Sequence, residues 1–254
     1  MAFVKRRSPP TAGSITAALD SFSAEVRFYR EVAPVLAVRV PQCYEALDGP
    51  AGTLLVLEDL SDWAPGGQPP VVAAQLRSLH DAWAGEAARR WPWLRPVGAA
   101  IDLVAALYDE TWPRLSNLPA MPAAVRAFGS RLQGRVPETE RLLGEIPQRT
   151  LIHGDATLNN VRTAPTGEVA FFDWEDVSSA PGVSDLAWLL VSSVPPEDWA
   201  DTVDAYGSAP HLAAAMPAAL VQGFLSLADF VDDAERRDPW IRRIEAGVAM
   251  AQAR

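Results

Sequence analysis

The chain has 254 residues, and 49% of them are hydrophobic, which is enough to bury a sizeable core in one large or two small units. Its net charge of −10 disfavours nucleic acid as a partner, because a phosphate backbone demands a basic surface. We find no apolar run near the roughly 18 residues that span a membrane, no signal-peptide core, and one cysteine, Cys43, which permits no internal disulfide. The composition therefore predicts a cytoplasmic protein that does not insert into membranes.

Residues 1–60 alternate strand-like and helical patterns. An apolar lead-in, Ala2–Val4, predicts a strand that delivers Lys5. Apolar residues at near-helical spacing predict an amphipathic helix over 20–33. Two further strand-like runs, 43–47 and 53–57, flank a segment of Asp, Gly, Pro and Ala that is typical of a turn.

The next stretch is predicted to be helical. Residues 63–70 are rich in Gly and Pro and indicate a linker. An amphipathic helix should begin at Pro70 and end before Gly85, and further helical patterns cover 101–112, 122–132 and 138–146. Beyond Asp185 the pattern is again almost wholly helical, as far as Ala253.

Two predicted strands carry the main polar motif. The apolar run 150–152 predicts a strand that ends at His153, where residues 153–160 read H-G-D-x-x-x-x-N. A turn then leads into a second strand, 169–172, which ends at Asp173. We expect these strands to form a hairpin, which would bring the two polar ends together.

The polar groups of this motif suit phosphoryl transfer. Asp155, Asn160 and Asp173 would supply two carboxylates and one amide at the strand ends. Transfer from ATP needs a carboxylate that orients the acceptor hydroxyl, together with oxygen ligands for Mg²⁺. Asp and Asn are also common turn formers, so an ordinary loop is the alternative interpretation of each residue alone.

The motif resembles that of a known family. Protein kinases use H-R-D-x-x-x-x-N and D-F-G at comparable spacing. Glycine at 154 and Asp-Trp at 173–174 are similar to the aminoglycoside phosphotransferase and choline kinase-like family, and Leu-Glu-Asp-Leu at 57–60 resembles the hinge of its ecdysteroid kinase-like branch. The resemblance implies an α+β, two-lobed protein-kinase-like fold with a truncated N-terminal lobe and a mostly helical C-terminal lobe. The nucleotide-binding lobe and hinge would occupy 1–62 and the catalytic and substrate-binding lobe 63–254.

The same resemblance assigns roles in the motif. It implies that Asp155 is the catalytic base, while Asn160 and Asp173 hold Mg²⁺ against the nucleotide phosphates. The adjacent amide Asn159 remains an alternative to Asn160. His153 is expected to brace the catalytic loop rather than to transfer a proton.

Asp185 is expected to play a supporting part. It lies in Gly-Val-Ser-Asp-Leu-Ala at 182–187, a segment that resembles the one following the family's metal-binding aspartate. The resemblance implies that Asp185 hydrogen-bonds the catalytic loop. The alternative is a helix N-cap, because Asp185 precedes an apolar helical run.

Nucleotide contacts are implied in the N-terminal segment. Lys5 is the single lysine among 22 basic residues, and an ammonium is a compact point charge that arginine replaces poorly. The resemblance implies that Lys5 contacts ATP and pairs with a glutamate on the following helix, where Glu25 is expected and Glu31 competes. Backbone groups of Glu58 and Leu60 would contact adenine. A solvated surface charge is the alternative for the charged residues.

The N-terminus departs from the family. Kinase-like folds place a strand, a glycine-rich loop and a second strand before the lysine strand, whereas four residues precede Lys5. We expect Met1 to be an internal methionine, with in-frame upstream DNA encoding the missing hairpin. Otherwise residues 8–14 would have to cover the phosphates, or nucleotide binding would be weakened.

These patterns predict an ATP- and Mg²⁺-dependent phosphotransferase that acts on a hydroxyl of a small molecule, such as an antibiotic or other natural product. One alternative is a peptide Ser/Thr phosphotransferase in a natural-product pathway, and another is a non-catalytic kinase-like binding module. Residues 1–40 are basic and the remainder acidic, which suits a cationic acceptor. Candidate acids for the acceptor, which are equally explained as solvated faces, are Glu175, Asp176, Asp229, Asp232 and Asp233.

Overall fold

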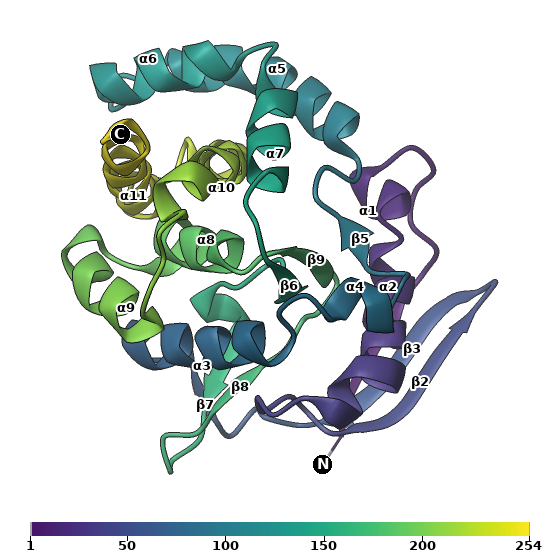
Figure 1. Cartoon of the computed structure of the whole chain (residues 1–254). Helices are drawn as coiled ribbons and strands as arrows, with labels where there is room; N and C mark the ends of the chain where they lie inside the picture. Colours follow the sequence, from purple (N-terminus) through teal and green to yellow (C-terminus); the bar gives the residue numbers. More distant parts are fainter. Residues whose placement is uncertain (1, 254) are drawn as a thin grey trace.

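A computed structural model describes residues 2–253, and its N-terminal part is built on one antiparallel sheet (Figure 1). Its strands lie in the order β1 (Ala2–Arg7), β3 (Gly52–Glu58) and β2 (Cys43–Gly49). In this register Lys5 of β1 lies opposite Leu55, a buried residue of β3. All three strands were predicted from the sequence.

The predicted helix over 20–33 is present, but it is irregular. A short helix, α1 (Ile15–Ala18), precedes α2 (Ser21–Arg27). The chain then continues as a π-helix, Phe28–Val32, and a 3-10 turn, Ala33–Val35. Val26 and Phe28 are fully buried, so this helical segment presents an apolar side to the core, as its periodicity indicated.

Two small three-stranded sheets carry the polar motif. One has the order β4 (Ala64–Pro65), β7 (Val161–Thr163) and β8 (Val169–Phe171), and the other β5 (Arg95–Pro96), β9 (Ser178–Pro181) and β6 (Arg149–Ile152). The predicted hairpin is therefore wrong in its pairing: β6 pairs with β9, whereas β8 pairs with β7, which begins directly after Asn160. The expected linker over 63–70 is also partly structured, because β4 pairs with β7.

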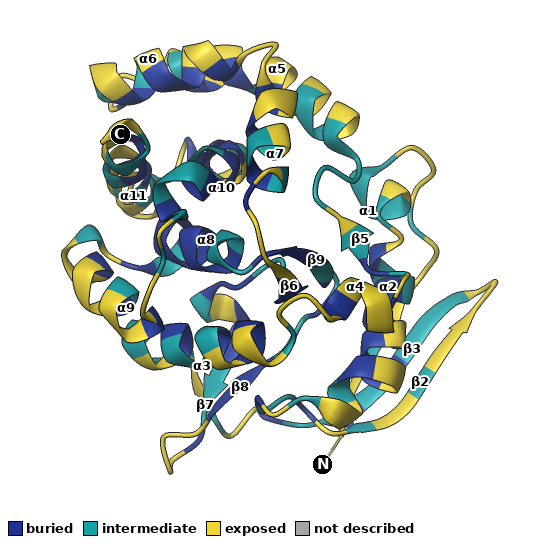
Figure 2. Cartoon of the chain, in the orientation of Figure 1, coloured by how far each residue is buried: buried dark blue, intermediate teal, exposed yellow. Residues whose placement is uncertain are grey.

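Helices make up most of the rest, as predicted. They are α3 (Pro69–Ala82), α4 (Ala87–Arg90), α5 (Ile101–Ser116), α6 (Ala123–Leu132), α7 (Val136–Gly144), α8 (Val183–Ser193), α9 (Trp199–Tyr206), α10 (Leu212–Leu227) and α11 (Ala234–Gln252). Short 3-10 turns lie at Leu158–Asn160, Pro196–Asp198 and Ala228–Phe230. Helices α8 and α10 are largely buried, whereas α6 exposes its outer side (Figure 2). The core of this part therefore lies around α8 and α10.

A pair of stacked rings joins the N-terminal helix to the segment that follows β8. Phe28 and Trp174 are both fully buried, and their ring centroids lie 4.1 Å apart at an interplanar angle of 10°. The Trp174 indole also donates to the Phe171 carbonyl at 3.2 Å. Burial of two large rings against each other contributes on the order of several kcal/mol, so it fixes Asp173, the preceding residue, relative to α2.

One helical segment is longer and more apolar than the sequence analysis expected. Residues Leu212–Phe230 form a 19-residue helical stretch that is long and apolar enough to cross a membrane. However, 56% of it is buried inside the protein, as in the core helix of a folded domain. The expectation that no apolar run reaches spanning length was therefore wrong, and its burial places this stretch in the core.

The packing of α5 against α6 gives a test of the fold that leaves the polar motif untouched. A Cβ at Gly129 would lie 2.1 Å from a ring carbon of the buried Trp112, and the neighbouring ring carbons leave it no room. We expect Gly129→Ala to lower the free energy of unfolding by about 1–3 kcal/mol in urea denaturation. Gly144→Ala is the control, because its Cβ would meet atoms only at 3.8 Å and beyond. Equal stability of the two variants would contradict this packing.

Candidate active site

Both carboxylate oxygens of Asp155 accept hydrogen bonds from side chains. It lies in the loop between β6 and β7, where the Asn160 side-chain amide donates to its Oδ2 at 2.7 Å. The indole Nε1 of Trp188, on α8, donates to its Oδ1 at 2.7 Å. Two donors from different elements fix the carboxylate in one orientation, which is what a positioned general base requires.

A buried carboxylate braces this loop from behind. Asp185 is 1% exposed, and it accepts hydrogen bonds from the backbone N–H groups of His153 (2.8 Å) and Gly154 (2.9 Å). His80 Nε2 lies 3.1 Å from its Oδ2. Burial alone would raise the pKa of the Asp185 carboxyl, but the His80 contact and the loop amide hydrogen bonds lower it. The hydrogen bonds expected between Asp185 and the catalytic loop are therefore present.

His153 joins the Asp155 loop to the strand that leads to Asp173. Its Nδ1 accepts from the backbone N–H of Asp155 at 3.3 Å, so the ring proton is placed on Nε2, which donates to the Phe172 carbonyl at 3.0 Å. The Phe172 N–H in turn donates to the Asn160 carbonyl at 3.1 Å. Because His153 is fully buried and both ring nitrogens are engaged, it braces the loop, as expected.

Glycine is required at position 154. Its φ is +86°, and a Cβ there would lie 2.0 Å from the backbone carbonyl oxygen of Asp176. Every larger residue would have to displace main chain as well as adopt the left-handed conformation. The middle glycine of the motif therefore lets the two polar segments approach each other.

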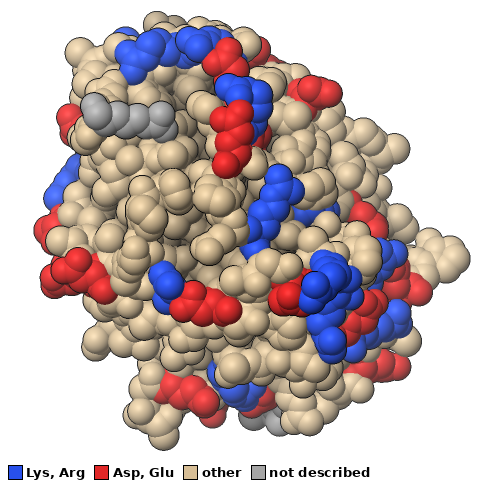
Figure 3. Space-filling view, in the orientation of Figure 1, with Lys and Arg blue, Asp and Glu red and all other residues tan. Residues whose placement is uncertain are grey.

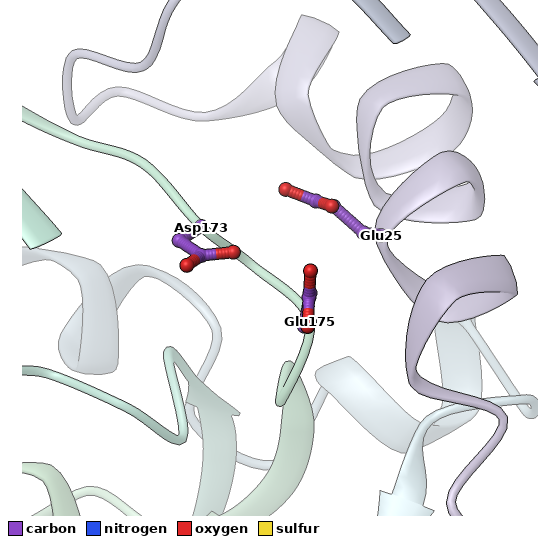
Figure 4. Close-up of side chains that lie close together, drawn as sticks. All are labelled: Glu25, Asp173 and Glu175. Carbon is purple, nitrogen blue, oxygen red and sulfur yellow. The ribbon is translucent and has the colours of Figure 1, made fainter. Parts of the chain in front are cut away.

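Lys5 lies among three carboxylates. Its Nζ is 2.7 Å from Glu25 Oε2, 2.6 Å from Asp173 Oδ1 and 2.8 Å from Glu175 Oε1. The three carboxylates converge from α2 and from the segment after β8 (Figure 4). Glu31, the competing candidate for the Lys5 partner, instead accepts from the Trp93 indole at 2.8 Å. The expected pairing of Lys5 with Glu25 is thus present, and Asp173 and Glu175 join it.

Burial and charge act against each other in this cluster. Burial alone would lower the pKa of the Lys5 ammonium, but Glu25 and Asp173 outweigh it and the pKa is raised. Burial raises the pKa of Glu25 to about 7, although Lys5 opposes the shift. Asp173 also has a φ of 63°, a left-handed conformation that is strained for a non-glycine residue. Such strain at a charged residue is common at functional sites.

The residues expected to form the hinge, Glu58 and Leu60, lie at the end of β3 and just after it, and their roles stay predictions. The side chain of Glu58 pairs with Arg39 at 2.5 Å, and its N–H donates to the Gln42 carbonyl at 2.8 Å. The Leu60 side chain is buried, and within residues 2–253 its N–H meets no acceptor. Leu60 therefore offers a backbone donor to a ligand, whereas the Glu58 N–H is already engaged.

The candidate acceptor acids are scattered. Glu175 belongs to the Lys5 cluster and also pairs with Arg7 at 2.9 Å. Asp176 pairs with Arg95 at 3.3 Å, and Asp232 with Arg114 at 3.2 Å. On the face shown in Figure 3, acidic and basic side chains are interspersed around a centre of other residues. That face offers no single-sign patch of charge.

Sequence reasoning missed the contact of Trp188 with Asp155, and it assigned Glu175 to the acceptor rather than to the Lys5 cluster. Trp188 follows Asp185 by three residues, so both lie on one side of α8, and this spacing could have indicated that they serve the same loop. Glu175 follows Asp173 by two residues. No local pattern indicates that both meet Lys5, because Asp173 adopts a left-handed conformation and Glu175 begins a turn.

Comparison with known proteins shows the family of this chain. A family model described as "Phosphotransferase enzyme family" matches residues 2–220. The chain belongs to this family. No curated protein sequence matches it.

Solved structures show the fold of this phosphotransferase family member. Choline kinase LicA from Streptococcus pneumoniae superposes with a TM-score of 0.58 at 18% identity, covering 100% of this chain and 86% of that one. Spectinomycin phosphotransferase APH(9)-Ia, solved with ADP and spectinomycin, gives 0.56 at 14% identity over 99% and 86%. Aminoglycoside phosphotransferase APH(3'')-Id from Streptomyces rimosus gives 0.54 at 18% over 97% and 86%. The α+β kinase-like fold expected from the sequence is therefore confirmed.

The raised pKa of Glu25 makes a prediction for stability. The folded protein holds a proton on Glu25 up to about pH 7, whereas the unfolded chain releases it near pH 4.5. This contribution to stability is therefore fully present below about pH 4.5 and is lost as the pH rises to about 7. We expect the stability difference between wild type and Glu25→Gln to change by about 1–3 kcal/mol over that window in urea denaturation.

Glu31→Gln, the same substitution on the same helical segment, controls for the loss of one acidic group. A difference between wild type and Glu25→Gln that stays constant from pH 4.5 to pH 7 would show that Glu25 does not titrate there.

Proposed function

We propose that this protein transfers the γ-phosphate of ATP, with Mg²⁺, to a hydroxyl of a small molecule. The observation that carries the proposal is the fixed carboxylate of Asp155 beside a segment that ends in Asp173 and contacts Lys5. Membership of a phosphotransferase family supplies the reaction class. The spectinomycin phosphotransferase of similar fold was solved with ADP and with its small-molecule acceptor, which supports both substrates by analogy.

Each residue then has a defined task. The acceptor hydroxyl gives its proton to Asp155, its oxygen bonds to the γ-phosphorus, and the bond from that phosphorus to the β–γ bridging oxygen breaks to release ADP. Trp188 and Asn160 keep the Asp155 carboxylate in its orientation during the transfer. Lys5 contacts the nucleotide phosphates, so their arrival has to compete with the carboxylates that now surround its ammonium.

The donor set fits magnesium. The Asn160 NH₂ is committed to Asp155, which leaves its Oδ1 without a partner among residues 2–253. The Asn160 carbonyl accepts from the N–H of Phe172, the residue before Asp173, whose carboxylate would be the second ligand. Hard oxygen donors of this kind are what Mg²⁺ prefers. Bound by Asn160 and Asp173, Mg²⁺ would neutralise charge that develops on the phosphates.

We also propose the division of labour along the chain. Residues 1–62 would form the partial nucleotide-binding lobe and hinge, since the β1–β3–β2 sheet ends at Glu58, and residues 63–254 the catalytic lobe. We place the reaction in the cytoplasm, where ATP is available, and expect an acceptor that carries positive charge. The idea that Met1 is an internal start concerns a residue outside the described range and stays a prediction.

Removal of the base should stop transfer but not nucleotide binding. In Asp155→Asn the shape is kept, but the amide cannot take the hydroxyl proton, and it cannot accept from both Asn160 and Trp188. We expect turnover to fall by roughly 10²–10⁴ with ATP affinity nearly unchanged. ADP release, measured against a panel of hydroxylated metabolites and antibiotics, and calorimetry with ATP give the two readouts. Near wild-type turnover by this variant would remove Asp155 from the role.

Removal of the metal carboxylate should abolish the magnesium dependence of binding. Asp173→Ala takes one negative oxygen donor from the cation, so the tightening of ATP binding by Mg²⁺ should disappear. Asn160→Ala should be milder because it removes a neutral ligand. Asp48→Ala, which alters an exposed acid near the end of β2, is the control for general loss of charge. If ATP binds Asp173→Ala and wild type equally with and without Mg²⁺, the metal site is elsewhere.

A further inference from the structure

A cavity of about 370 Å³ reaches the catalytic loop from the helical side. Its walls come from α1, α5, α7, α8 and α10, which surround the same region in Figure 1. Gly154 and Trp188 line it, and Trp188 is the residue whose indole holds Asp155. The volume lies in the range of small-molecule sites, so a ligand here would contact Gly154 and Trp188, the two lining residues next to Asp155.

Most of the wall is apolar and its α10 side is made of small residues. Three alanines of α10, Ala215, Ala218 and Ala219, line the cavity. Opposite them stand aliphatic residues such as Ile15 of α1 and Leu143 of α7. Sugar hydroxyls placed against these apolar walls would go unsatisfied, although Thr16, Ser178, Ser184 and Gln222 also line the cavity. An apolar ligand body fits better.

The charged residues of the lining are nearly all paired within the protein. Asp176 pairs with Arg95, and Glu175 pairs with Lys5 and Arg7. Nη1 and Nη2 of Arg95 also reach backbone carbonyls, including that of Glu175 at 2.9 Å, whereas its Nε is buried without a partner among the described residues. Asp185, also in the lining, is satisfied by His80 and the loop amides.

Glu140 is the exception. It stands on α7 and lines the cavity, and its carboxylate accepts a hydrogen bond from the backbone N–H of Gly98 but has no ion pair among residues 2–253. Burial raises the pKa of Glu140, as expected for a carboxyl shielded from water without a cation beside it. A partly buried carboxylate gains most from a ligand cation that replaces its lost hydration.

We propose that this cavity binds the acceptor and that the acceptor is an apolar molecule with one protonated amine, which pairs with Glu140 while its hydroxyl faces Asp155. The inference rests on the proposed function for the identity of the ligand as an acceptor. A polycation is disfavoured here because its other ammonium groups would meet apolar walls and carboxylates that already have partners.

The test compares two probes that differ in one group. The probes are 2-amino-1-phenylethanol, which is cationic at neutral pH, and 1-phenyl-1,2-ethanediol, in which a neutral hydroxyl replaces the amine. Binding is followed by ligand-observed NMR titration without nucleotide. We expect the amine to bind the wild type more tightly, and Glu140→Gln to weaken it by at least about tenfold, because a charged hydrogen bond is lost. Diol binding should be unchanged by this substitution.

Two further variants sharpen the result. Glu138→Gln alters an exposed glutamate on the same helix, which pairs with Arg135 outside the cavity lining, and it should leave both probes unaffected. Glu140→Asp keeps the charge and should retain part of the preference for the amine. Equal binding of amine and diol by wild type, or equal amine binding by wild type and Glu140→Gln, would overturn the proposal.

Because no nucleotide is present, these outcomes do not depend on phosphoryl transfer. Loss of the amine preference with intact ADP release would refute this inference alone. An intact preference in a protein that neither binds ATP nor releases ADP would refute the proposed function, and with it the naming of this ligand as an acceptor.

Discussion

The geometry of the site depends on one buried charge, the carboxylate of Asp185. A carboxylate that is 1% exposed is costly unless donors replace the water it has lost. Its donors are the N–H groups of His153 and Gly154, so satisfying the charge fixes the backbone of the catalytic loop on α8. The same helix supplies Trp188, whose indole then meets Asp155 from a set direction. The hydrogen bonds that satisfy this buried carboxylate therefore position the loop, in addition to the turn propensity of its residues.

A second set of contacts connects the loop at His153 to the N-terminal sheet and helix. His153 binds the Phe172 carbonyl, and Trp174, two residues on, stacks on Phe28 just beyond α2. Lys5 then meets Asp173 at 2.6 Å between the two parts of the chain. This ion pair is partly buried, so it is sensitive to what else enters the site. The arrival of anionic phosphates or of a divalent cation would rearrange it, which couples ligand binding to the contact between the two parts.

Much of this could be predicted from local sequence, because the decisive signals were local. The apolar runs before His153 and Asp173 predicted β6 and β8, and helical spacing placed Glu25 on the segment that reaches Lys5. The pairing of the strands could not be predicted in the same way. The partner of β6 is β9, a Ser-Ser-Ala-Pro sequence with no strand signal, whose conformation comes from its place in the fold.

The residues that face the acceptor could not be predicted from the sequence for a related reason. Acids after Asp173 were proposed to face the acceptor, yet two of them are paired within the protein. The cavity carboxylate that has no ion pair among the described residues is Glu140, on a helix distant in the sequence. Charge counts along a chain do not show which acids have partners. Only the packing of α7 against α10 brings Glu140 to the cavity that ends at Trp188.

Lys5 offers the most direct measurement, since it is the single lysine of the chain. A sample labelled with ¹⁵N-lysine gives one side-chain ammonium signal, and the low exposure of Lys5, 13%, favours slow enough exchange to observe it. On titration with Mg²⁺ and ATP, the account predicts a saturable shift of that signal, as phosphates replace carboxylates around Nζ. If calorimetry shows that ATP binds while the signal stays in place, the nucleotide lies elsewhere and the account of this site is contradicted.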